Sequence, residues 1–75
     1  MTIEEIQAKS SEYFAHCGYG NQETELLSVA YTARSAMRKM KLFAGADYFR
    51  SVLLRHGVNV QAADDEILQL GALKV

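Results

Sequence analysis

The 75-residue chain is 49% apolar and 23% charged, which is typical of a folded globular protein and excludes a disordered one. Its length suits one domain over residues 1–75, and its single cysteine excludes an internal disulfide and favours a reducing compartment. A signal-peptide pattern and an apolar run of about 18 residues are both lacking, so we expect a cytoplasmic protein with no membrane segment.

The first predicted helix begins after Thr2. Thr2 and Glu5 have the spacing of a capping box, in which hydroxyl and carboxylate accept from each other's free backbone N–H groups. Gly18 suits the left-handed position that follows a helix end. The apolar side chains of this segment fall on one face and are Ile3, Ile6, Tyr13, Phe14 and Cys17.

The next segment, from about residue 22 to 44, is predicted to be the longest helix, and Gly45 is expected to end it. Its apolar arc spans about 140°, which is wide enough to pack against two neighbouring helices. We therefore expect this helix to be the central one. The residues of the arc are Leu26, Val29, Ala30, Ala33, Ala36, Met37, Met40, Phe43 and Ala44.

Two shorter helices are predicted in the remainder of the chain. The first runs over residues 48–56, with Asp47 as its cap, Leu53 on its apolar face and Leu54 on the other. The second runs over residues 62–70 and is expected to stop at Gly71. These elements predict an all-α fold, a compact bundle of three to four helices around the long helix at about 22–44.

Catalytic and metal-binding patterns are not found. The soft ligands are His16, Cys17 and His56, and zinc requires three or four ligands that converge. His16 and Cys17 are adjacent on a helix and point about 100° apart. Cys17 is expected to be buried at a helix C-terminus, where a thiolate is disfavoured. We expect no enzyme activity, no catalytic residue, no cofactor and no metal.

Charge is unevenly distributed along the chain. Residues 1–25 hold five acidic residues and one basic one, residues 26–56 hold six basic residues and one acidic one, and residues 57–75 hold three acidic residues and one basic one. Acidic outer helices packed against a basic middle would explain this pattern. A basic patch that binds an acidic partner is the alternative.

The candidate binding residues lie on the predicted long helix, outside its apolar arc. A mixture of aromatic, aliphatic and arginine side chains is typical of protein interfaces. The residues we expect to contact a partner are Leu27, Tyr31, Arg34, Arg38 and Lys41.

We therefore predict a small cytosolic protein–protein interaction module. It would act by binding a larger protein, as a regulator, inhibitor or assembly factor, and would self-associate as a homodimer, because so short a chain is marginally stable alone. The alternative is a nucleic-acid-associated protein that uses the basic row Arg34, Arg38 and Lys41. Nucleic acid is disfavoured because the net charge of the chain is −1.

Overall fold

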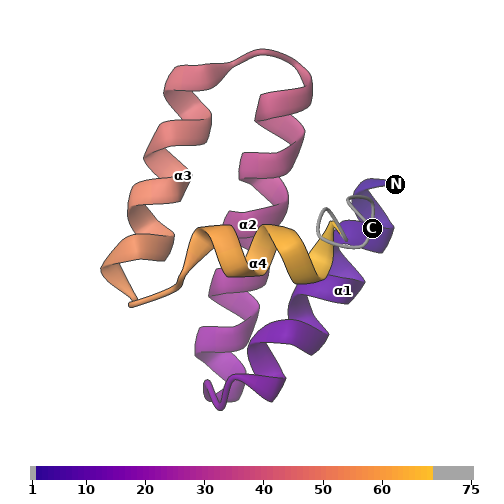
Figure 1. Ribbon diagram of the computed structural model, residues 1–75, viewed down its shortest axis with the longest axis vertical. Helices are drawn as coiled ribbons and strands as arrows, with labels where there is room; N and C mark the ends of the chain where they lie inside the picture. Colours follow the sequence, from indigo (N-terminus) through magenta and orange to yellow (C-terminus); the bar gives the residue numbers. More distant parts are fainter. Residues whose placement is uncertain (1, 69–75) are drawn as a thin grey trace.

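The computed structural model describes residues 2–68, which form four α-helices and no β-strand, so the predicted all-α class is confirmed. The helices are α1 (Ile3–His16), α2 (Asn21–Lys39), α3 (Phe43–Arg55) and α4 (Val60–Ile67). α1 and α3 lie on either side of α2, and α4 crosses α2 on one side of this layer (Figure 1). Gly71 and the end of the predicted 62–70 helix lie outside the described residues.

The start and end of α1 follow the predicted signals. Thr2 Oγ1 accepts from the Glu5 backbone N–H at 3.1 Å, and Glu5 Oε1 accepts from the Thr2 backbone N–H at 3.3 Å. The Thr2 backbone N–H and the Thr2 hydroxyl both donate to Glu5 Oε1, at 3.3 and 3.1 Å, and these two hydrogen bonds lower the pKa of Glu5. Gly18 has a φ of 93° and follows the C-cap, as predicted. The capping box is therefore confirmed.

α2 ends at Lys39, and the prediction that it continues to Ala44 is wrong. Lys41 has a φ of 60°, which turns the chain into the left-handed region. The Lys41 N–H donates to the Arg38 carbonyl, and the Leu42 N–H donates to the Met37 carbonyl at 2.8 Å. This hydrogen-bond pair is the Schellman arrangement, which usually has glycine where Lys41 stands. The chain therefore turns before Gly45, which lies inside α3 and faces Met37.

The core is built mainly from large side chains of all four helices. The largest fully buried apolar residues are Ile6, Phe14, Leu27, Tyr31, Leu53 and Ile67. Phe14 makes edge-on ring contacts with Tyr19 and with Tyr31. On α3, Leu53 is buried and Leu54 is exposed, which confirms the predicted orientation of this helix, although it begins at Phe43 and not at residue 48.

The face of α2 that meets the core is not the predicted one. Leu27 and Tyr31 are fully buried, whereas Leu26 and Val29 of the predicted apolar arc are about half exposed. Besides Leu27 and Tyr31, α2 buries mostly polar or small side chains. They are Ser28, Ala30, Thr32, Arg34 and Ser35.

The hydroxyl groups of Ser28 and Thr32 make their part of this polar face compatible with burial, whereas Ser35 Oγ is buried without a hydrogen-bond partner among the described residues. Ser28 Oγ lies 3.0 Å from Ser10 Oγ and 2.9 Å from Ser11 Oγ of α1, and it donates to the Gln7 carbonyl at 3.2 Å. Thr32 Oγ1 donates to the Ser28 carbonyl at 2.7 Å. Because serine is small and its hydroxyl is satisfied here, α1 and α2 can pack closely without a desolvation penalty.

α4 is short and begins immediately after the loop that follows α3. Asn59 caps it by accepting from the Ala62 backbone N–H at 3.1 Å. Val58 and Val60, on either side of the Asn59 cap, are both buried in the core. Their burial fixes the loop against the bundle, so α4 is held across α2 and α1 with Asp64 directed inward.

Candidate interaction surface

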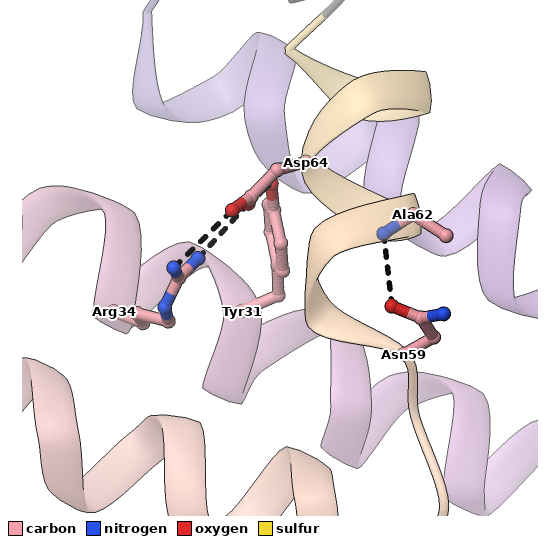
Figure 2. A network of polar contacts seen from close by, with 5 residues as sticks. All are labelled: Tyr31, Arg34, Asn59, Ala62 and Asp64. Atoms are coloured by element: carbon pink, nitrogen blue, oxygen red, sulfur yellow. Dashed lines mark hydrogen bonds and ion pairs between the residues drawn. The ribbon is translucent and has the colours of Figure 1, made fainter.

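A buried ion pair joins α2 to α4. Arg34 Nη1 lies 3.0 Å from Asp64 Oδ1, and Arg34 Nη2 lies 3.3 Å from Asp64 Oδ2. The Tyr31 hydroxyl donates to the same Asp64 Oδ1 at 2.6 Å. Figure 2 shows both α2 side chains converging on Asp64, one turn beyond the Asn59 cap. Two donors from α2 therefore share one carboxylate of α4.

The surroundings of this cluster strengthen its electrostatics. The Arg34 side chain is only 5% exposed and the Asp64 side chain 14% exposed, so water screens their attraction poorly. The Arg34 guanidinium carbon lies 5.9 Å from the centre of the Tyr31 ring. Burial, and then the hydrogen bond to Asp64, raise the pKa of the Tyr31 hydroxyl. The cluster is a structural link that keeps Tyr31 protonated.

This cluster changes the picture of the five predicted contact residues. Leu27, Tyr31 and Arg34 lie inside the bundle, so their expected exposure is wrong. Arg34 pairs with an acid of α4, in agreement with the internal explanation of the charge pattern. Arg38 and Lys41 are exposed. The five residues do not form one surface. The side of α2 that carries Leu27, Tyr31 and Arg34 was predicted to face solvent, but it faces the core.

The exposed side of α2 carries the apolar residues that were predicted for the core. Leu26 is 48% exposed, Val29 is 50% exposed and Met40 is 61% exposed. Between them, Ala33, Ala36 and Met37 are half-buried. We call these six residues the outer face of α2. Its members recur at the three- and four-residue steps that keep side chains on one side of a helix.

The outer face is a candidate binding surface that the sequence-based interpretation assigned to the core. Its residues were recognised as one stripe, but a wide apolar arc was assumed to point to the core. The signal that could have corrected this is the second row of small hydroxyl residues on the same helix, Ser28, Thr32 and Ser35. A row of this kind on a helix face is compatible with close packing against another helix.

A mixed hollow of about 560 Å³ lies between α1 and α4. Cys17 and His16 line it, together with Tyr13 and Glu66. Cys17 is exposed, which contradicts its expected burial, because it is the C-cap of α1 and lies at the edge of the bundle. Burial, and then the neighbouring Cys17 thiol, raise the pKa of Tyr13. His16 is exposed and its Nε2 lies 4.0 Å from Glu12 Oε1.

A second, smaller hollow of about 280 Å³ lies between α2 and α3. Arg34, Arg38 and Arg50 line it, together with the carboxylate of Asp47. Near the other end of α3, His56 Nδ1 lies 3.0 Å from Glu23 Oε2 of α2. His56, the C-cap of α3, therefore links the end of this helix to α2.

Within residues 2–68, no group of three or more His, Cys, Asp or Glu side chains is arranged to hold a metal ion. None of the four helices in this range combines the length and the apolarity that crossing a lipid bilayer requires. Comparisons with protein-family models, with curated proteins and with solved structures find no significant match to this chain.

Proposed function

We propose that this protein is a small cytoplasmic protein–protein interaction module that binds its partner through the outer face of α2. It would act by binding alone, as a regulator, inhibitor or assembly factor. One observation supports the proposal above all: α2 directs Leu26, Val29 and Met40 to solvent, each close to half exposed or more, while it buries Arg34.

The energetics favour a partner for this face. Burying an apolar side chain of this size contributes about 1.5–3 kcal/mol relative to leaving it in water. A helix that buries polar residues and exposes aliphatic ones gives up that contribution in the free protein. A partner that covers the outer face would recover it, and contiguous apolar patches on soluble proteins mark such contact sites.

The test is affinity capture with the full chain and two matched variants. Val29→Lys combined with Met40→Glu keeps the net charge and disrupts the outer face of α2. Tyr48→Lys combined with Leu54→Glu makes the same exchange on exposed positions of α3, where the side chains are 62% and 47% exposed. Circular dichroism checks that both variants keep their helices.

We expect the α2 variant to lose the captured proteins, including captured copies of the chain itself, and the α3 variant to retain them. If both variants capture the same set as the parent, the outer face is not the binding site. If the parent captures nothing and is monomeric, the binding role itself is wrong.

Nucleic-acid binding is the second candidate, and one observation favours it: three arginines, Arg34, Arg38 and Arg50, line a single hollow. Arg34 is already paired with Asp64, which leaves two free to meet phosphates. Fluorescence anisotropy with a generic DNA duplex separates the candidates. Phosphate binding requires an affinity that falls steeply between about 50 and 200 mM salt, whereas an apolar contact changes little.

A further inference from the structure

We propose that the partner of the outer face of α2 is a second copy of this chain, packed with its α2 antiparallel around a two-fold axis beside Ala33. This inference rests on the proposed binding role of the outer face and specifies its occupant. Three features of α2 support it: the spacing of the apolar residues, their distribution of sizes, and the charges at the two ends of the helix.

The spacing is that of a coiled-coil seam. From Leu26, five of the six outer-face residues recur at alternating steps of three and four. This repeat keeps a line of side chains facing one partner helix over several turns, as in heptad positions a and d. The full seam is Leu26, Val29, Ala33, Ala36 and Met40.

The sizes along the outer face are self-complementary. Ala33 lies midway between Leu26 and Met40, and also midway between Val29 and Met37. A two-fold axis at Ala33 therefore places Leu26 of one copy beside Met40 of the other, whereas Met37, at the position opposite Val29, packs against Gly45 of its own chain. The small alanines at the centre allow the two helices to approach closely, and the larger side chains at the ends fill the space beyond them.

The charges of α2 decide the orientation. Its N-terminal part carries the exposed Glu25, since Glu23 is already paired with His56 of α3, and its C-terminal part carries Arg38 and Lys39, followed by Lys41. An antiparallel pair brings the acidic end of each copy to the basic end of the other, whereas a parallel pair brings like charges together. Glu25 and Lys39 directly precede the seam residues Leu26 and Met40, so they lie on the same flank of the interface.

Size exclusion with light scattering gives the first measurement, on the full chain over a range of concentrations. We expect a monomer–dimer equilibrium, and we expect Val29→Glu to raise the dissociation constant by about 100-fold or more, because the symmetric interface would bury two unpaired carboxylates. The α3 variant Leu54→Glu, at an equally exposed position, is the matched control and should dimerise like the parent.

Cross-linking gives the orientation. In a Cys17→Ser background, cysteine is introduced singly by Leu26→Cys, Ala33→Cys or Met40→Cys, and a short bismaleimide is added. We expect Ala33→Cys to cross-link with itself, and a mixture of the Leu26→Cys and Met40→Cys chains to cross-link while each alone does not. In the antiparallel pair, two Leu26→Cys thiols are about 20 Å apart along the helix axis, beyond a short linker.

Two results would overturn the inference. Self-cross-linking of Leu26→Cys and of Met40→Cys indicates a parallel pair, and a strictly monomeric parent chain without cross-links excludes self-association. In the monomeric case, protein capture that still depends on Val29 and Met40 would leave the proposed binding role intact with a different partner. If capture does not depend on these two residues either, the proposed binding role of the outer face and the proposed dimer are both wrong.

Discussion

Gly45 of α3 lies so close to Met37 of α2 that a Cβ added to Gly45 would come within 2.5 Å of the Met37 sulfur. The residue expected to end a helix therefore forms a helix–helix contact. Side chains normally separate packed helices. Because Gly45 has only a hydrogen atom in place of a side chain, the start of α3 can approach the end of α2 directly after the turn. The contact can be tested by a double-mutant cycle.

At an exposed position inside a helix, a change from glycine to alanine raises the free energy of unfolding by about 1 kcal/mol. In the parent chain, Gly45→Ala should give a smaller gain, because the Met37 thioether must move. In a Met37→Ala background the same change should yield the full gain. Urea unfolding of the four proteins measures the coupling. Equal effects of Gly45→Ala in both backgrounds would contradict a close contact.

Lys41 provides a test of where α2 ends. Its φ of 60° is unfavourable for a residue with a Cβ and accessible to glycine. We expect Lys41→Gly to be more stable than Lys41→Ala by about 1 kcal/mol in thermal or urea unfolding. This order is the reverse of that inside a helix, where alanine is preferred by about the same amount. A more stable alanine variant would indicate that α2 continues through this position.

Removing one member of the buried ion pair should be costly. Asp64→Ala leaves the Arg34 guanidinium buried without a carboxylate, and we expect a loss of about 3–5 kcal/mol in the free energy of unfolding. That is a large part of the roughly 4–11 kcal/mol available to a chain of this length. Denaturant unfolding followed by circular dichroism measures it, and a loss below about 1 kcal/mol would argue against the pair.

The double variant Arg34→Met with Asp64→Leu is the informative partner of that experiment. Replacing both charges by apolar groups of similar size removes the desolvation cost together with the attraction. We expect it to recover most of the stability lost in Asp64→Ala. Recovery would show that the pair serves to position α4 more than to stabilise the bundle.

Ionisation of the Tyr31 hydroxyl should lower the stability of the folded protein at high pH. Burial and Asp64 raise its pKa in the folded protein, while an unfolded tyrosine titrates near pH 10. The folded state therefore keeps the Tyr31 proton to a higher pH than the unfolded state. The contribution of this proton to the free energy of unfolding is fully present below about pH 10 and is lost as the pH rises further, by up to about 1.4 kcal/mol per pH unit.

Tyr31→Phe removes this titration, so its stability should fall less steeply than that of the parent from about pH 10 to 11. It should also be less stable at neutral pH by about 1 kcal/mol, because the hydrogen bond to Asp64 is lost. The slope with pH, measured by urea unfolding, is the decisive quantity. Tyr48→Phe, at a 62% exposed position, should keep the parent slope.

Local signals predicted the parts of the fold that depend on neighbouring residues. The Thr2 and Glu5 capping box, the turn at Gly18 and the inward position of Leu53 each depend on residues a few positions apart. The break after α2 could not be predicted in this way. It depends on Lys41 adopting a conformation that its side chain disfavours, and no glycine or proline stands there to indicate it.

Apolar periodicity did not identify the inward face of α2, because the partners of this face are remote in sequence; the hydroxyl row Ser28, Thr32 and Ser35 was the local signal for it. Arg34 is buried only because Asp64 arrives from α4, and Ser28 only because serines of α1 meet it. Periodicity alone assigns the apolar stripe to the core. For this reason the sequence-based prediction placed Tyr31, on the other side of α2, at the surface. Of the predicted binding residues, Arg38 and Lys41 are the ones that solvent reaches.

α2 buries polar side chains and exposes apolar ones, so the residues that hold the fold together differ from those that form its exposed apolar surface. Its fold depends on Ser28, Tyr31 and Arg34, which face inward, whereas Leu26, Val29 and Met40 contribute little to the interior. Substitutions at these three exposed positions are therefore expected to leave the interior of the bundle unchanged. Such a helix could acquire a new partner, in evolution or in the laboratory, while the residues that hold the four helices together stay the same.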